Sequence, residues 1–132
     1  MQILAVRHAP DSGIKTEVEI AATAEELIRL AEALTANESE EGAVPDTGRR
    51  TGSEMLRAVK IQRTPGRPVL VSVDWDSHVL QVSGGHAQME VFASEIRGIA
   101  EETAAGHHQH FDYFPDHFYL DSKTLSLVVK LV

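Results

Sequence analysis

Hydrophobic and polar residues alternate along the segment 14–20 with the two-residue period of a β-strand. Ile14, Thr16, Val18 and Ile20 fall on one face of such a strand, and the lysine and two glutamates between them fall on the other face. A strand with one wet face and one covered face shows this pattern. We therefore predict a strand over residues 14–20.

A helical pattern follows directly after this strand. The hydroxyl of Thr23 can accept a hydrogen bond from an early helical N–H, and Glu26 is placed to reach back to the backbone of the cap. Apolar residues then recur with the spacing of one helix face at Leu27, Leu30, Ala31 and Leu34. The pattern predicts a helix that begins after Thr23, ends near Asn37 and packs against a sheet.

The rest of the chain repeats these two periods. Alternation predicts five further strands, and the spacing of Met89, Phe92 and Ile96 predicts a second helix. The strands are expected at residues 55–63, 68–74, 78–82, 107–114 and 125–132, and the helix at residues 86–102. The order β-α-β-β-β-α-β-β, with short hairpin connections, indicates an α+β fold in which one mainly antiparallel sheet carries two helices on one face.

Length and composition favour one domain spanning residues 1–132. A chain of 132 residues that is 42% hydrophobic and 24% charged can build one core of ordinary size. The segment 37–52 has almost no large apolar residue, is first acidic and then rich in Gly, Pro and Arg, and is predicted to be a mobile surface loop. No apolar run approaches the roughly 20 residues of a membrane helix, and the start of the chain lacks a secretory pattern. We expect a cytoplasmic protein that does not contact membranes.

The net charge of −8 argues against general affinity for nucleic acid, because a phosphate backbone attracts clustered Lys and Arg. The exception is a basic segment at residues 47–67, which contains Arg49, Arg50, Arg57, Lys60, Arg63 and Arg67. A groove for RNA is one interpretation of this segment. The solvated face of a hairpin, balanced by acidic neighbours, is the interpretation we favour.

Histidines and aromatic residues are concentrated at residues 107–119. In a strand, His108, His110 and Asp112 would project from one side, while Phe111 and Tyr113 would project from the other side with the remaining odd-numbered residues. Two imidazoles and a carboxylate suit Zn(II), Ni(II) or Fe(II), and a further histidine, at position 117, could join them. An exposed polar face opposite a packed aromatic face and a surface that binds a protein partner are the other two interpretations.

Other catalytic motifs are absent from the sequence. There is no cysteine, no Gly-x-Ser-x-Gly motif and no phosphate-binding loop, and Gly84-Gly85 is expected to be a strand-to-helix turn. Asp74 and Asp76 are expected to cap backbone N–H groups in a hairpin turn. Trp75 between them either folds over the sheet edge or stands out as a contact residue.

The C-terminal segment resembles the signature of a family of small bacterial immunity proteins from polymorphic toxin systems, catalogued as immunity protein 32. The resemblance is carried by HQHFDYFPDHFYL at residues 108–120, by Ser122 and by the apolar residues 127–129. It extends upstream through the Pro-Gly pair at residues 65–66, VSVD at residues 71–74 and LQVSGG at residues 80–85. The resemblance implies a non-enzymatic protein without a cofactor that binds and blocks a cognate toxin domain.

These considerations lead to one favoured function and two alternatives. We expect an immunity protein that neutralises its toxin by occlusion, since an acidic inhibitor is steered toward a basic toxin. The residues expected to contact the partner are Trp75, His108, His110, Asp112, Tyr113 and Tyr119. The first alternative is a metal-binding module or metal-dependent enzyme that uses His108, His110, Asp112 and His117. The second alternative is an RNA-binding module that uses the basic segment.

Overall fold

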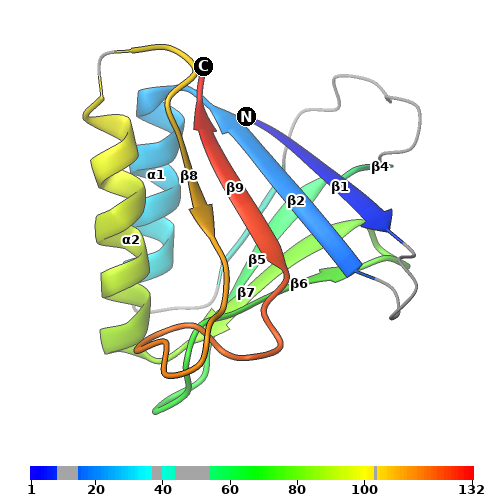
Figure 1. The fold of residues 1–132 in the computed structure, drawn as a ribbon, viewed down its shortest axis with the longest axis vertical. Coiled ribbons are helices and arrows are strands. Elements are labelled where there is room, and N and C mark those ends of the chain that lie inside the picture. Colours follow the sequence, from blue (N-terminus) through cyan, green and yellow to red (C-terminus); the bar gives the residue numbers. More distant parts are fainter. Residues whose placement is uncertain (9–14, 37–39, 44–53, 103) are drawn as a thin grey trace.

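The computed structural model of the chain describes residues 1–8, 15–36, 40–43, 54–102 and 104–132. Within these ranges it has two β-sheets and two helices (Figure 1). The five-stranded sheet has the spatial order β4 (Glu54–Met55), β1 (Gln2–His8), β2 (Lys15–Ala22), β9 (Ser126–Leu131) and β8 (His108–Phe111). The four-stranded sheet has the order β3 (Glu40–Ala43), β5 (Ala58–Arg63), β7 (Val79–Gly84) and β6 (Leu70–Asp74). The helices are α1 (Ala24–Thr35) and α2 (His86–Ala100).

The α+β class is confirmed, but the prediction of a single, mainly antiparallel sheet is wrong. Both sheets are mixed, because β2 pairs with β9 in parallel and β5 pairs with β7 in parallel. Each helix carries the chain from one sheet to the other: α1 connects β2 to β3, and α2 connects β7 to β8. The strands that precede and follow a helix therefore belong to different sheets.

The predicted strand at residues 55–63 is divided between the two sheets. The amide of Leu56 donates to the carbonyl of Ile3 over 2.9 Å, and the amide of Arg57 donates to the carbonyl of His78 over 2.8 Å. Two successive residues thus bond to different sheets, and the chain changes sheet between β4 and β5. The strands β1 and β3 were not predicted.

The local predictions for the helices are confirmed. The Thr23 hydroxyl accepts from the Glu26 amide over 3.2 Å, and the Glu26 carboxylate accepts from the Thr23 amide over 3.0 Å, so the capping box is complete. Leu27, Leu30, Ala31 and Leu34 are buried, as are the predicted apolar residues of α2. Gly85 is the N-cap of α2, which confirms the strand-to-helix turn.

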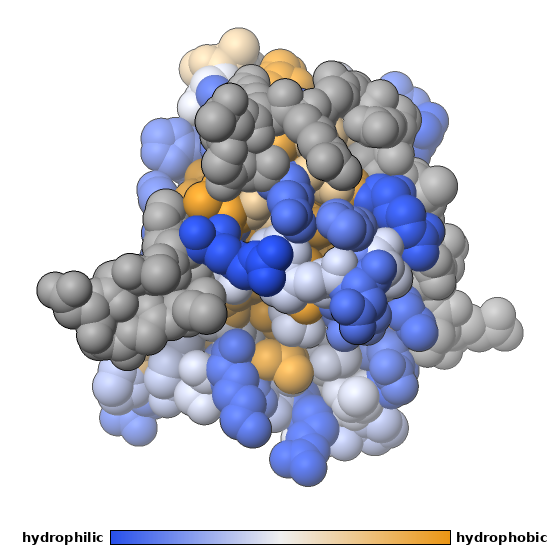
Figure 2. All heavy atoms as spheres, turned by 90° about the vertical axis from the view of Figure 1, so that its right-hand side faces the viewer, coloured by the Kyte–Doolittle hydropathy of each residue, from blue (hydrophilic) through white to orange (hydrophobic). Residues whose placement is uncertain are grey.

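One hydrophobic core joins both sheets and both helices. The two helices pack against each other on one side of the molecule, and both sheets extend away from them (Figure 1). The core includes Val18 and Ile20 of β2, Leu80 of β7, and Phe92 and Ile96 of α2. The side of the molecule that faces away from the helices is mainly hydrophilic, with small hydrophobic areas between polar side chains (Figure 2).

The segment 37–52, predicted as a mobile surface loop, contains the strand β3. Its other residues lie outside the described residues, so the mobility of this segment stays a prediction. The single domain over residues 1–132 also stays a prediction. Neither helix of the described chain is long and apolar enough to cross a membrane.

Candidate functional site

An open groove of about 700 Å³ has residues of both sheets in its lining. It is lined by Thr16 and Glu17 at the start of β2, by residues 71–73 of β6, by Trp75, and by residues 112–113 and 122–126 of the C-terminal part. The groove brings together Trp75, Asp112 and Tyr113, which sequence analysis had placed in the partner-binding surface. Residues separated by nearly 40 positions therefore form one concave surface.

The segment 119–125 runs beside β6 and forms one side of this groove. The amide of Val69 donates to the carbonyl of Tyr119 over 2.7 Å, and the amide of Asp121 donates back to the carbonyl of Val69 over 2.8 Å. The amide of Leu125 donates to the carbonyl of Val71 over 3.1 Å. These bonds cover part of the outer edge of the four-stranded sheet and hold the aromatic C-terminal segment beside the groove.

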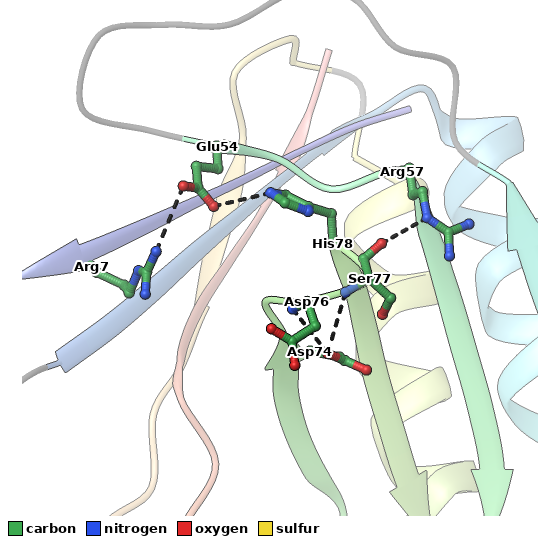
Figure 3. A network of polar contacts seen from close by, with 7 residues as sticks. All are labelled: Arg7, Glu54, Arg57, Asp74, Asp76, Ser77 and His78. Carbon is green, nitrogen blue, oxygen red and sulfur yellow. Dashed lines mark hydrogen bonds and ion pairs between the residues drawn. The ribbon is translucent and has the colours of Figure 1, made fainter.

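Trp75 is held at the groove by a residue of the other sheet. The guanidinium carbon of Arg7 on β1 lies 4.1 Å from the centroid of the indole ring. Nη2 of Arg7 lies 3.6 Å from Oε1 of Glu54, and Oε2 of Glu54 lies 3.3 Å from Nε2 of His78 (Figure 3). A chain of polar contacts therefore connects β1, β4 and the turn that carries Trp75.

The turn itself is held by Asp74, as predicted for this position. Oδ1 of Asp74 accepts from the amide of Asp76 over 3.1 Å and from the amide of Ser77 over 3.4 Å (Figure 3). Hydrogen bonds from Ser77 lower the pKa of Asp74 below its ordinary value. Nε of Arg57 donates to the carbonyl of Ser77 over 2.7 Å. Of the two positions expected for Trp75, the structure shows the one folded over the sheet, because the side chain is partly buried and packs against the core.

The predicted strand at residues 107–114 is shorter in the structure, because the chain leaves the sheet after Phe111. The hydroxyl of Ser126, the first residue of β9, donates to Oδ1 of Asp112, the residue that follows β8. Asp112 and Tyr113 consequently lie beyond the strand and line the groove.

The metal-site alternative is not supported by the geometry. His108 and His110 are exposed on β8 with ring centroids 5.3 Å apart, but Nδ1 of His117 accepts from the amides of Tyr119 and Leu120 over 3.3 and 3.1 Å. His117 therefore caps a turn outside β8. Within the described residues, no group of three or more His, Asp or Glu side chains could hold a metal ion.

Tyr119 was predicted to contact the partner, and in the structure its side chain lies in the core. It is 2% exposed, and its hydroxyl donates to Oε2 of Glu95 on α2 over 2.6 Å. Gln109 of β8 donates to the same oxygen over 3.1 Å. Burial, together with the Glu95 carboxylate, raises the pKa of Tyr119 above its ordinary value.

Two aromatic residues that were not predicted to contact the partner have the most exposed aromatic side chains of the described chain. Phe114 is 57% exposed and Phe118 is 74% exposed. The sequence placed both within an aromatic cluster, but alternation in a strand could not show which rings face solvent once the strand had ended at Phe111.

The basic segment does not form one free surface in the part that the structure describes. Arg57 bonds to the turn at Ser77, and Nη2 of Arg63 donates to the carbonyl of Ala36 at the end of α1. Arg49 and Arg50 lie outside the described residues. Arg57 and Arg63, two of the cations proposed for an RNA groove, thus form hydrogen bonds between elements of the fold.

Comparison with known protein families identifies a match. The model of a family described as Immunity protein 32 matches residues 17–46 and 79–132, which is more than half of the chain. The matched ranges include most of β2, all of α1 and α2, and residues 107–119, where histidines and aromatic residues are concentrated. Comparisons with curated proteins and with solved structures found no match.

Proposed function

The chain belongs to the Immunity protein 32 family, and on this premise we propose that it binds a cognate bacterial toxin domain and neutralises it by occlusion. The protein acts stoichiometrically, without chemistry of its own and without a cofactor. It acts in the cytoplasm, where a toxin made or received by the cell would otherwise reach its target.

The family match is the observation that carries this proposal, and the groove gives it a physical basis. Trp75 and Tyr113 place large, rigid aromatic surfaces in a concave site, and such side chains often supply much of the binding energy of an interface. Two carboxylates, those of Glu17 and Asp112, line the same groove together with one lysine, Lys123. A site with this composition fits an apolar and basic segment of a partner.

The charge of the chain supports the same kind of partner. A protein with a net charge of −8 attracts a basic toxin over a distance comparable with the Debye length, which is about 8 Å at physiological salt. Such attraction raises the rate of association more than the affinity of the final complex. Rapid capture is useful to an inhibitor that must act before its toxin does.

The proposed contact surface consists of Trp75, Asp112 and Tyr113 in the groove, together with His108 and His110 on the exposed face of β8. Tyr119 is left out of this surface, because its side chain is buried. Replacing it would disturb the core beneath the surface rather than the contact itself.

The proposal is tested by capture followed by substitution. A tagged copy, expressed in the native cells, should retain one specific toxin partner through a high-salt wash. Trp75→Ala and Tyr113→Ala should each weaken binding of that toxin by about 30-fold, the effect of losing an interface anchor. The control is Arg29→Ala, which changes an exposed residue of α1. Repeated recovery of the tagged protein alone, from cells that contain the toxin, would contradict the proposal.

A further inference from the structure

An exposed aromatic loop adjoins the groove. Five large hydrophobic side chains are exposed in the described part of the chain, and three of them, Tyr113, Phe114 and Phe118, lie within six consecutive positions. Scattered apolar residues are normal on a protein surface, but a contiguous group marks a site of interaction. We call residues 113–118 the aromatic loop.

The aromatic loop is held in one conformation by its own hydrogen bonds. The amide of His117 donates to the carbonyl of Phe114 over 3.0 Å and closes a tight turn. Pro115 and Asp116 occupy the two central positions, and Asp116 has φ of +68°, a combination that fits a type II turn. Nδ1 of His117 then accepts from the amides of Tyr119 and Leu120.

The ring of His117 also separates and supports the two phenylalanines. Its centroid lies 4.6 Å from that of Phe114, and it is stacked on Phe118 at 5.9 Å with an interplanar angle of 8°. The His117 ring also contacts the buried ring of Tyr119 edge to face, with centroids 4.6 Å apart. The two exposed rings are therefore fixed on the core before any partner arrives, which lowers the entropic cost of binding.

The charge around the aromatic loop indicates what covers it. Between Asp112 and Asp121 the chain has three aspartates and neither lysine nor arginine. Asp116, at the tip of the turn, is exposed and makes no hydrogen bond or ion pair with the described residues. A second copy of this chain, or an anionic lipid surface, would bring like charges together at this point.

We propose that Phe114 and Phe118 are further anchors for the toxin beside those in the groove, that they enter an apolar pocket on its surface, and that Asp116 meets a lysine or arginine at the rim of that pocket. The inference rests on the proposed function and deepens it by naming the contact. His117 is a positioning residue, which holds the rings but does not itself carry the contact.

The test uses the full chain and the toxin domain recovered with the tagged wild-type protein. Phe114→Ala and Phe118→Ala should each weaken binding about 30-fold, while the melting temperature stays near that of the wild type because both rings are exposed. Ile28→Ala is the matched control, because Ile28 is a 43% exposed hydrophobic residue on α1. It should leave binding unchanged.

Two further variants separate positioning from contact. His117→Ala should weaken binding, whereas His117→Asn should restore part of the loss, because the amide oxygen of asparagine can accept the same backbone N–H groups. Asp116→Asn should slow association and reduce its salt dependence, with a smaller effect on dissociation.

The outcomes distinguish this inference from the proposed function. Failure of the wild-type protein to bind any toxin would remove the proposed function. If the wild type binds the toxin and both phenylalanine variants bind it within about twofold as tightly, the difference is too small for an anchor. This result would overturn the inference and leave the proposed function intact. Two other results would also overturn the inference. The first is that the wild type forms a dimer and Phe118→Ala dissociates it. The second is that the wild type co-sediments with phosphatidylglycerol vesicles and Phe118→Ala abolishes this.

Discussion

Arg7 and Trp75 meet across the two sheets, with the guanidinium carbon 4.1 Å from the centroid of the indole ring. Arg7 belongs to β1 of the five-stranded sheet, and Trp75 belongs to the turn after β6 of the four-stranded sheet. The pair connects the two sheets. It also fixes the orientation of the aromatic side chain that lines the groove.

The first prediction concerns this pair. Arg7→Ala should lower the free energy of unfolding by about 0.5–1 kcal/mol, the usual contribution of a cation–π contact near the surface. Trp75 is the only tryptophan of the chain, so intrinsic fluorescence reports its surroundings directly. Acrylamide should quench the fluorescence of the variant more strongly than that of the wild type. Equal quenching in Arg7→Ala and in the control Arg29→Ala would show that Arg7 does not hold the ring.

The second prediction separates a core role from a contact role at Tyr119. Tyr119→Phe removes a hydroxyl that donates to the Glu95 carboxylate over 2.6 Å, and should destabilise the protein by about 1.5–3 kcal/mol. Toxin binding by the folded variant should stay unchanged. The exposed Tyr113 provides the control, because Tyr113→Phe should leave the free energy of unfolding unchanged. Chemical denaturation of the three proteins measures this, and a Tyr119→Phe variant as stable as the wild type would contradict it.

The third prediction concerns the pH dependence of the turn that carries Trp75. The folded protein lowers the pKa of Asp74 below 3.8, so the unfolded state binds more protons in acid. The stabilising contribution of Asp74 is therefore complete above the unfolded pKa and is lost as the pH falls through the folded pKa. Asp74→Asn should remove this part of the acid slope, whereas Asp76→Asn should keep it. Denaturation between pH 2 and pH 6, an interval that brackets the ordinary pKa of an aspartate, provides the measurement. Identical acid slopes in all three proteins would contradict the account.

The fourth prediction concerns metal. Because His117 accepts hydrogen bonds from its own turn, we expect untagged protein to contain less than one zinc, nickel or iron ion per chain. A chelator should leave the melting temperature unchanged, since no bound ion would stabilise the folded state by mass action. One bound metal per chain, lost when both His108 and His110 are changed to alanine, would overturn this expectation.

Local structure could be predicted from the sequence because it depends on nearby residues. The capping box at Thr23 and Glu26 uses residues three positions apart, and the buried face of α1 follows directly from the spacing of its leucines. The hydrogen bonds of Asp74 likewise stay within its own turn. In each case the interacting residues lie within a few positions of one another in the sequence.

The pairing of strands could not be predicted in this way. Alternation shows which face of β2 or β9 is buried, but it does not show that the two strands pair in parallel more than 100 residues apart. β1 was missed because Ile3, Leu4 and Ala5 are all buried, so the strand does not alternate between wet and dry positions. The site shows the same limit, since tertiary contacts bury Tyr119 and leave Phe118 exposed.

The central claim is that this chain neutralises a toxin by occupying its surface, one molecule to one. Its most direct test is a titration of the activity of the captured toxin domain with increasing amounts of this protein. The account predicts that activity falls linearly to zero at equimolar concentration, and that active toxin is recovered when the complex is dissociated. Loss of toxin activity at far less than one equivalent, or a toxin that stays inactive after separation, would contradict it.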